Sequence, residues 1–550
     1  MKSKLILIGI VALILSSCAK KEEPVQKLTF LRTSGQYMVN ETNDTILLRG
    51  IGLGNWLLPE GYMWHFGEAG DRPRKIEKIV EDLTSPEFNQ KFWKEFRKNY
   101  ITEADIKRIK ELGYNSVRPA LNARVFMTEG DTAVFIEENF ALLDSLVEWC
   151  EKQQLYVILD MHGAPGGQTG QNIDDSPNNE PELFMNPVFE HRLTRLWMKL
   201  VERYKDNPVV AGYDLLNEPL PENTGAAEKY KHLLMPMYKR LTEQIRTIDQ
   251  KHMIILEGYN WSNNWSEFTE VFDDNVVHQF HYYCWSNPDN LNDISYFLQE
   301  RERLGTPVWV GETGERNPVI YFGTTQYFEY NNIGWSFWPW KKINNRQVLY
   351  SVKEPEGYDK IVEFSRGGEK PSKELAEKAF MQLLENIKIE NCDFLEHISQ
   401  SILRQVPARV YAVNYGHDGA GFSFWANDTI NAEYYRKNEP VKTVLLPADT
   451  TKRWQNRDIA ILLNDEEGTL YNVFATNDFN ATVTLKVKAN QPNSDFSFSV
   501  NGTANQFSVP DTIWTELKVE NAKFITGKNT LKTEVSDGSV SFLHFDVEKK

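Results

Sequence analysis

The chain has 550 residues, of which 41% are hydrophobic and 12% aromatic, and its formal net charge is −16. This length exceeds what one hydrophobic core normally supports, so we expect two domains. The apolar content excludes a disordered chain. Nucleic acid is excluded as a partner, because phosphate binding needs clustered Lys and Arg and the sequence has only short basic pairs.

The N-terminus begins MKSKLILIGIVALILSSCAKKEEP. Lys2 and Lys4 precede an apolar run, Leu5 to Leu15, that is too short to span a bilayer. The run ends in LSSC, which resembles a bacterial lipobox, so residues 1–17 are expected to be a signal peptide and Cys18 the lipidated residue. With residues 18–30 as a tether, these features predict an outer-membrane lipoprotein of a Gram-negative bacterium, on the cell surface or the periplasmic face.

Eight short apolar segments alternate with helical patterns between about residues 46 and 340. The expected strands cover residues 46–54, 115–121, 156–162, 209–218, 252–259, 276–283, 307–313 and 333–340. Near-continuous apolar strands with intervening helices imply a parallel sheet covered by helices. Eight repeats fit a (β/α)8 TIM barrel. An open doubly wound sheet would show a Gly-rich turn leading into a helix, and GIGLGNW is followed by no clear helix.

The intervening segments carry helix signals and two long insertions. Thr102 is a candidate N-cap with Asp105 three residues later, and Gly113 is placed to end that helix. Residues 137–153 and 226–249 repeat apolar side chains three and four apart. The insertions, at about 59–100 and after the third strand, follow strand C-termini, where barrels build their sites. A helix near residues 372–387 is expected to close the barrel.

The sequence pattern changes near residue 405 from alternating strands and helices to mainly strands. Alternating strand patterns such as ATVTLKVKAN are separated there by Gly, Asn and Asp turns, with little helix. We therefore expect a barrel domain over residues 31–390, a linker over 391–404 and an antiparallel β-sandwich over 405–550. Cys150, Cys284 and Cys392 are odd in number and far apart, so they indicate neither a disulfide framework nor a metal site.

Polar side chains gather at the ends of the expected barrel strands. They are Arg118, His162, Asn217, Glu218, His281, Tyr283 and Glu312, followed by Trp335 and Trp338 on the last strand. Each alone has a common structural explanation, such as a helix cap, a satisfied core group or an ion pair. Strand ends of a barrel meet at one mouth, however, and an unsatisfied buried polar group costs about 1–3 kcal/mol. The presence of all these polar residues at the same end of the barrel predicts a functional site.

The residue types indicate the chemistry. Glu218 and Glu312 come from opposite sides of the ring, and two facing carboxylates between aromatic walls suit glycoside hydrolysis. A carboxylate near Arg118 is held ionised, whereas one in a less polar niche keeps its proton. No metal is expected, because His162 and His281 have no third ligand at a usual spacing, and no cofactor is expected either.

The segments NSVRPAL, DMHGAPGGQTG, LLNEP, FHYY, GET and GWSFWPWK resemble glycoside hydrolase family 5, within the clan of retaining (β/α)8 hydrolases. The resemblance covers about residues 45–345. It implies that Glu218 is the acid/base, that Glu312 is the nucleophile and that Arg118 lies near the nucleophile. It also implies that His162, Asn217, His281 and Tyr283 orient the carboxyls and the sugar, and that Trp338 floors the subsite of the cleaved sugar.

RGIGLGNWLLPE is similar to the opening of the exo-β-1,3-glucanase branch, which implies that Glu60 reaches the non-reducing sugar. Asn55 replaces a Gly of that branch, and the insertion over residues 60–100 reshapes the mouth, so linkage and exo action stay open. We expect retaining hydrolysis of a β-glucan by a monomer anchored to the membrane by lipid. The alternatives are an endo-acting β-1,4-glucanase or β-mannanase, a transglycosylase, and a non-catalytic glycan-binding lipoprotein.

The C-terminal segment resembles carbohydrate-binding modules of the family 6 type in VYAVNYGHDGAGFSFW and NRDIAILL. Trp454 and Trp514 are candidate sugar platforms, with buried core Trp as the alternative. The closing strand VSFLHFDV lacks the Asn with which such modules commonly hold sugar. This absence favours a structural sandwich that braces the barrel.

Overall fold

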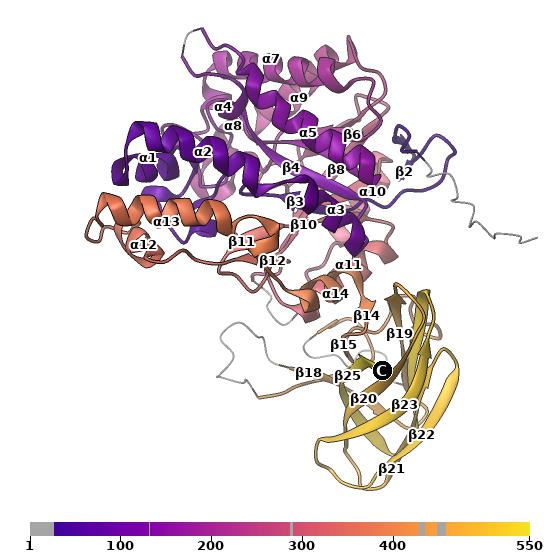
Figure 1. Cartoon of the computed structure of the whole chain (residues 1–550). Coiled ribbons are helices and arrows are strands. Elements are labelled where there is room, and N and C mark those ends of the chain that lie inside the picture. Colours follow the sequence, from indigo (N-terminus) through magenta and orange to yellow (C-terminus); the bar gives the residue numbers. More distant parts are fainter. Residues whose placement is uncertain (1–26, 131, 287–289, 428–434, 448–457) are drawn as a thin grey trace, which may run out of the picture.

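A computed structural model describes residues 27–130, 132–286, 290–427, 435–447 and 458–550. The expected signal peptide, the lipidation site Cys18, most of the tether and Trp454 lie outside these ranges. Within them, none of the helices combines the length and the apolar character that crossing a bilayer requires. Figure 1 shows a barrel built by the first part of the chain and a pair of sheets built by its end.

Eight parallel strands close into a barrel, which confirms the predicted fold class. In sequence they are β3 (Arg49–Leu53), β4 (Ser116–Asn122), β5 (Tyr156–Gly163), β6 (Val210–Asp214), β7 (Met253–Glu257), β8 (Val276–Tyr282), β9 (Val308–Gly314) and β10 (Gly334–Trp338). β10 pairs with both β3 and β9, so the sheet has no edge. Each of the eight expected segments overlaps one of these strands, and β4, β5 and β9 end one residue later than expected.

The fourth expected strand extends four residues too far at its C-terminal end. β6 ends at Asp214, and the chain then passes through Asn217, whose N–H donates to the Met161 carbonyl at 3.1 Å, to Glu218. Glu218 and Leu220 have φ angles of 44° and 50°, which are incompatible with a strand. The apolar run continues past the strand because these residues remain buried at the mouth of the barrel.

Helices surround the barrel. The longer ones are α3 (Glu103–Leu112), α5 (Glu137–Gln153), α7 (Pro187–Tyr204), α9 (Leu234–Arg246), α10 (Ser295–Leu304) and α11 (Pro318–Tyr330). The ends of α3 follow the sequence signals: the Thr102 N–H donates to Asp105 Oδ2 at 2.9 Å, and Gly113 takes a φ of 108°. The segment 226–249 is divided between α8 (Ala226–Tyr230), a short 3-10 turn and α9.

The first insertion folds into α1 (Pro73–Leu83) and α2 (Pro86–Tyr100). Later helices are α12 (Tyr358–Ser365), α13 (Lys373–Asn386) and α14 (Glu396–Leu403). α13, the helix expected to close the barrel, packs against α2, with the rings of Phe92 and Phe380 5.3 Å apart. The insertion is therefore covered by a helix from much later in the chain.

Two six-stranded sheets form the C-terminal part. One contains β14 (Gln405–Val406), β19 (Gly468–Ala475), β24 (Gly527–Asp537), β21 (Ser494–Val500), β22 (Thr503–Val509) and β16 (Phe424–Trp425). The other contains β17 (Lys442–Leu445), β18 (Ile459–Asn464), β25 (Ser539–Lys549), β20 (Phe479–Ala489), β23 (Thr515–Phe524) and β15 (Arg409–Tyr411). Apart from the parallel β14–β19 pair, the pairings are antiparallel. Phe496 of β21 lies 5.1 Å from Phe542 of β25, which joins the two sheets in one core.

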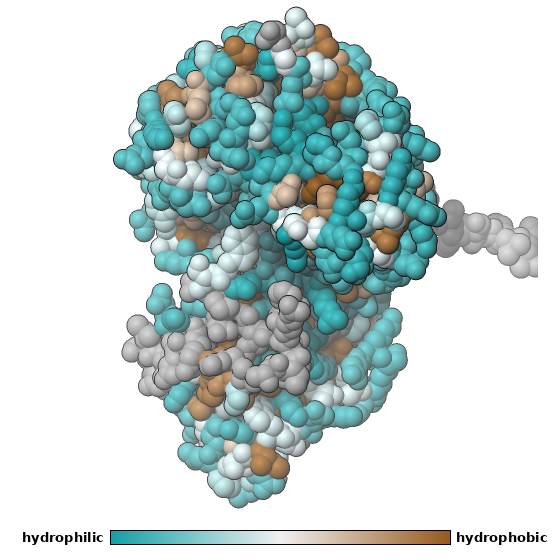
Figure 2. Space-filling view, turned by 90° about the vertical axis from the view of Figure 1, so that its left-hand side faces the viewer, coloured by the Kyte–Doolittle hydropathy of each residue, from teal (hydrophilic) through white to brown (hydrophobic). Residues whose placement is uncertain are grey.

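The face drawn in Figure 2 is predominantly polar. On the face drawn in Figure 2, apolar residues form small separate patches on a hydrophilic background. Trp514 is half-buried, with the Lys488 ammonium 5.8 Å from its ring. The three cysteines of the described chain, Cys150, Cys284 and Cys392, are free thiols.

Candidate active site

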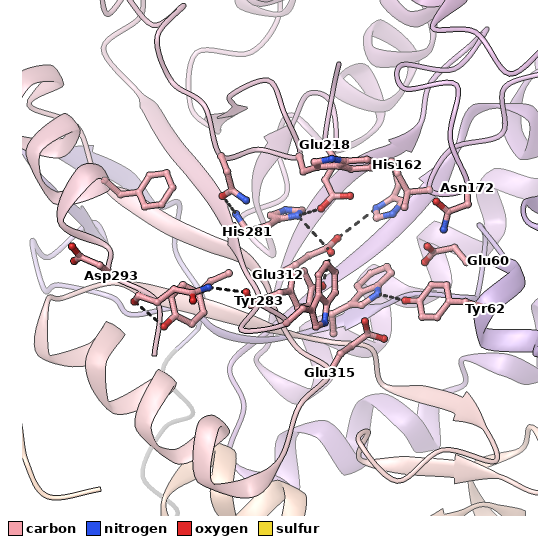
Figure 3. Close-up of a pocket in the computed structure, with 18 residues that line it drawn as sticks. Glu60, Tyr62, His162, Asn172, Glu218, His281, Tyr283, Asp293, Glu312 and Glu315 are labelled. Carbon is pink, nitrogen blue, oxygen red and sulfur yellow. Dashed lines mark hydrogen bonds and ion pairs between the residues drawn. The ribbon is translucent and has the colours of Figure 1, made fainter. Parts of the chain in front are cut away.

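A pocket of about 660 Å³ opens at the C-terminal ends of the barrel strands (Figure 3). Seven of the residues predicted to form a site line it: Glu60, His162, Glu218, His281, Tyr283, Glu312 and Trp338. Arg118 and Asn217 are fully buried behind this lining. The structure therefore brings all nine residues to one end of the barrel, seven facing the cavity and two supporting it.

Glu312 lies near the end of β9 and is held by two donors. Arg118 Nη1 donates to its Oε1 at 2.7 Å, and the Tyr283 hydroxyl donates to its Oε2 at 2.9 Å. Burial raises the pKa of Glu312, and the Glu218 carboxyl adds to the rise, whereas His281 and Arg118 favour the charged form. The two hydrogen bonds fix the orientation of this carboxylate toward the cavity.

Glu218 is presented by a strained turn. Its φ of 44° is unusual for a residue with a side chain, and the Glu257 carboxylate holds the turn by accepting the Glu218 N–H at 2.7 Å. His281 Nδ1 lies 2.7 Å from Glu218 Oε1. Burial lowers the pKa of His281, but Glu257, Glu312 and Glu218 together raise it well above its ordinary value. A protonated His281 therefore donates to Glu218.

The two carboxyls are close neighbours. One oxygen of Glu218, one of Glu312 and a nitrogen of His281 all lie within 4.8 Å of one another. In the part of the chain that the structure describes, this is the cluster of His, Cys, Asp and Glu able to hold a metal ion. A cation there would have to compete with the guanidinium of Arg118, which already binds Glu312. Proton transfer and nucleophilic attack are the chemistry that this geometry favours.

Arg118 is the centre of a buried ion network that the sequence analysis missed in part. Besides Glu312 it contacts Asp160 at 3.2 Å, Asp214 at 2.8 Å and Glu257 at 3.0 Å, and all of these partners except Glu312 are completely buried. Burial raises the pKa of Asp160 to about 8 and that of Asp214 well above its ordinary value. Acidic residues inside otherwise apolar strand segments were the signal for these three groups.

Asn217 links this network to the imidazole of His162. Its Oδ1 accepts from Arg118 Nη2 at 2.8 Å, and its Nδ2 lies 3.3 Å from His162 Nε2. His162 Nδ1 in turn lies 2.8 Å from Asp160 Oδ2. Burial lowers the pKa of His162 to about 4, so the ring is neutral at pH 7. These contacts fix the ring beside Glu312, at 3.8 Å from Oε1.

Trp338 explains two glycines, Gly52 in the first strand and Gly54 just after it. A Cβ placed on Gly52 or Gly54 would lie 2.4–2.5 Å from its ring, so the strand must be bare where the indole packs. Trp338 also stacks on His162, with centroids 5.1 Å apart, and donates from Nε1 to the Tyr62 hydroxyl at 3.1 Å. It lines the pocket but is only 3% exposed, so little of the ring is available to a sugar.

Other lining residues were not predicted. Tyr62, Asn172 and Ile173 come from the two insertions. Tyr282 ends β8, and the remainder follow β7, β8 or β9: Trp261, Asn263, Trp285, Asn292, Asp293, Phe297 and Glu315. Trp285 is 57% exposed and stacks on Tyr283, with ring centroids 4.3 Å apart. Local sequence patterns do not mark these residues, because loops place side chains by tertiary contacts rather than by periodicity.

A closed barrel of eight parallel strands, with two carboxylates facing each other at the C-terminal ends of its strands, is the arrangement of a glycoside hydrolase. The cellulase family (glycosyl hydrolase family 5) matches residues 80–344 of the chain. The chain belongs to this family, and it is a glycoside hydrolase.

Three curated relatives illustrate the range of the family. A β-xylosidase of Phanerodontia chrysosporium is 29% identical over 361 residues, which are 60% of this chain and 74% of that protein. Endoglucanase C of Acetivibrio thermocellus is 30% identical over 262 residues, or 47% of this chain and 69% of the relative. A probable glucan 1,3-β-glucosidase A of Aspergillus fumigatus is 25% identical over 281 residues, which are 48% of this chain and 64% of the relative.

Proposed function

We propose that the protein hydrolyses β-glycosidic bonds of a β-glucan with retention of configuration, using Glu312 as the nucleophile and Glu218 as the acid/base. The observation that carries this proposal is the separation of the two carboxyls, because one oxygen of Glu218 lies within 4.8 Å of one oxygen of Glu312. Retaining enzymes place these groups about 5–5.5 Å apart, whereas inverting enzymes need about 6.5–9.5 Å to admit a water molecule between carboxylate and sugar.

In the first step, the ionised Glu312 attacks the anomeric carbon while Glu218 protonates the glycosidic oxygen. The bond to the leaving group breaks, and an ester forms between Glu312 and the sugar. Arg118 and Tyr283 stabilise the ionised form of Glu312 before attack, because both donate hydrogen bonds to its carboxylate. His281 donates to Glu218 Oε1, which leaves the other carboxyl oxygen to carry the transferable proton.

In the second step, water replaces the leaving group. Glu218, now ionised, removes a proton from this water as its oxygen attacks the anomeric carbon and displaces Glu312. Two inversions restore the β configuration. Arg118 and Tyr283 assist again, because they stabilise the carboxylate that departs.

The choice of a β-glucan is supported by the relatives, two of which are named as a glucan 1,3-β-glucosidase and an endoglucanase. Exo action is supported by the insertions. In Figure 3, Glu60, Tyr62 and Asn172 lie together on one side of the pocket, where they bound the space available to a sugar chain. An endo-acting β-1,4-glucanase, a β-mannanase and a transglycosylase remain the alternatives.

The deciding experiment is a panel of β-1,3-, β-1,4- and β-1,6-linked glucans and β-mannan, with product sizes and the first-formed anomer recorded by NMR. We expect glucose as the first product from a β-glucan, released as the β-anomer. An α-anomer would contradict the Glu218–Glu312 mechanism. Larger products from an internal cut would replace exo by endo action, and products longer than the substrate would indicate transglycosylation. Complete inactivity on the whole panel would favour a glycan-binding protein.

We further propose that Cys18 is lipidated, so that a monomer is anchored to the outer membrane, and that residues 405–550 form a sandwich of the carbohydrate-binding-module type. Support for the anchor comes from the sequence around Cys18 alone. Labelling with a fatty-acid analogue tests it: Cys18→Ala should abolish incorporation and release the protein from the membrane fraction. Equal labelling of both proteins would contradict the anchor.

A further inference from the structure

We infer that the C-terminal sheets hold the leaving-group side of the active site in place. The positioning residues are Arg436 of the C-terminal part and Asn290 of the barrel, which meet where these two parts of the chain are in contact; we call this contact region the joint. What the pocket cleaves is taken from the proposed function, whereas the contacts between the two parts of the chain are independent of it. The sandwich would then serve the reaction through the barrel loops, without itself touching a sugar.

The central contact joins residue 436 to residue 290. The Arg436 N–H donates to Asn290 Oδ1 at 2.9 Å, and the same oxygen accepts the Leu291 N–H at 2.9 Å. Arg436 has a φ of 57°, which is unusual for a residue with a side chain. Its guanidinium donates to the Gly416 carbonyl at 2.7 Å and lies 3.8 Å over the Tyr415 ring. Arg436 is therefore fixed within the C-terminal part and presents its N–H to the barrel.

Residues 290–294 transmit this contact to the pocket. Asn292 Nδ2 donates to the Tyr283 carbonyl at 2.8 Å, and the Tyr282 hydroxyl donates to the Asn292 carbonyl at 2.9 Å. Asn292 and Asp293 line the pocket themselves. Tyr283 binds Glu312 and carries the stacked Trp285. The segment thus fixes one wall of the cavity, and the C-terminal part fixes the segment.

A second contact anchors the joint on α11, the helix that follows the Glu312 strand. Asn414 Nδ2 donates to the Val319 carbonyl of α11 at 3.0 Å, and its Oδ1 accepts the Tyr435 hydroxyl at 2.8 Å. A Cβ on Gly323 of α11 would lie 1.9 Å from that hydroxyl, so the two parts approach as closely as a glycine allows. Figure 1 shows α11 and α14 between the barrel and the sheets.

The wall that is held in this way is the leaving-group side. In Figure 3, Tyr283 and Asp293 lie on the side of the pocket away from Glu60 and Tyr62. Glu60 belongs to the side assigned to the cleaved sugar. The exposed ring of Trp285 is then available to a departing sugar, because aromatic faces stack on the apolar faces of sugar rings.

Four variants of the full chain test the inference. Asn290→Ala removes the shared acceptor, and Asn290→Asp restores one. Gly323→Ala forces Tyr435 away without changing any lining residue. Gln405→Ala is the matched control. Gln405 also joins the C-terminal part to the barrel, because it donates to the Leu112 carbonyl at 3.1 Å. Leu112 precedes β4, so this contact lies at the end of the barrel opposite to the pocket.

Kinetics are measured with β-glucan oligosaccharides and with β-glucosyl fluoride, whose leaving group is too small to contact the wall. For Asn290→Ala and Gly323→Ala, we expect KM for the oligosaccharide to rise about five-fold, the effect of losing one hydrogen bond. We expect kcat/KM for the fluoride to stay within about two-fold of wild type. Asn290→Asp and Gln405→Ala should match wild type on both substrates. Equal losses on both substrates in Asn290→Ala would overturn the inference.

Hydrogen–deuterium exchange separates this inference from the proposed function. Exchange of residues 283–286 and 290–294 should accelerate in Asn290→Ala and Gly323→Ala, and should be unchanged in Gln405→Ala. Wild-type exchange in both test variants would overturn the inference whatever the substrate is. If the enzyme cleaves neither substrate while exchange accelerates as expected, the proposed function is wrong and the contact between the two parts stands.

Discussion

Nη1 of Arg118 lies 2.7 Å from Oε1 of Glu312, and both side chains are buried. The contact joins the second barrel strand to the seventh across the interior of the barrel. The same guanidinium also binds Asp160, Asp214 and Glu257, which are fully buried. Charge compensation inside the barrel and orientation of the proposed nucleophile therefore depend on one side chain.

We expect Arg118→Met to lower the free energy of unfolding by about 3–5 kcal/mol, because it leaves buried acids without their cation. Urea denaturation measures the change. Arg240→Met is the matched control: Arg240 pairs with Glu190 at the surface with half of its side chain exposed, so its loss should cost less than about 1 kcal/mol. Equal losses in the two variants would contradict the role of the buried network.

We expect Glu312→Ala to abolish hydrolysis of an activated aryl β-glucoside, because no carboxylate remains to attack the anomeric carbon. Azide should restore turnover by occupying the space of the missing side chain, and the product should be the α-glycosyl azide. Product configuration is read by NMR. A β-glycosyl azide, or activity near wild type without azide, would show that Glu312 is not the nucleophile.

Glu218→Gln should affect substrates according to their leaving groups. With a leaving group that departs without protonation, such as 2,4-dinitrophenolate, the variant should carry out the first step at a rate near that of wild type. With an unactivated β-glucan, the rate should fall about 10²–10⁴-fold. Pre-steady-state release of the phenolate measures the first step. A uniform loss on both substrates would indicate that Glu218 does not donate the proton.

Tyr283→Phe should shift the pH profile. Burial raises the pKa of Glu312, and the Tyr283 hydroxyl opposes the rise by donating to the charged carboxylate. Removing this donor should raise the pKa further, so the acidic limb of kcat/KM moves to higher pH, by about one unit. Tyr204→Phe is a control, because the Tyr204 hydroxyl donates to Asp144 outside the pocket and not to Glu312. A limb that stays in place would contradict this electrostatic role.

Glu329 links the first barrel strand to the residue that follows α14, since it binds both Arg49 at 2.8 Å and Arg404 at 2.6 Å. Burial raises its pKa, but Arg404 and Arg49 lower it to about 2. A depressed carboxyl pKa stabilises the fold above the unfolded pKa, and the contribution is lost as the pH falls toward 2. We expect Glu329→Gln to cost about 3 kcal/mol at pH 7 and progressively less below about pH 5.

Urea denaturation at several pH values tests this dependence, with the exposed Glu302→Gln as the control. A cost for Glu329→Gln that did not change with pH would contradict the ion-pair explanation. Trp335 belongs to the same cluster: its Nε1 lies 3.2 Å from Glu329 Oε1, which places its polar edge in the joint and not in the pocket. The sequence had placed Trp335 among the residues at the strand ends.

The sequence predicted the barrel because each strand and helix is marked locally. The capping pair Thr102 and Asp105 and the left-handed Gly113 give the bounds of α3 to the residue. The fifth strand was recognised, but no functional residue was predicted at its end, and Glu257 there contacts Arg118 and holds the Glu218 turn. A carboxylate in an apolar strand shows its role only when its partner on another strand is known.

Periodicity, caps and the residue types at strand ends thus determined the fold class and the residues that meet at the pocket, because these are properties of short segments and of parallel-strand geometry. The family was implied by the resemblance of six short motifs. Tertiary structure decided which groups share charge with Arg118, how Glu218 is turned toward Glu312, and which wall the C-terminal sheets hold. Such features depend on contacts between residues far apart in the chain. Arg436 and Asn290 are 146 positions apart, and nothing in either segment predicts their contact.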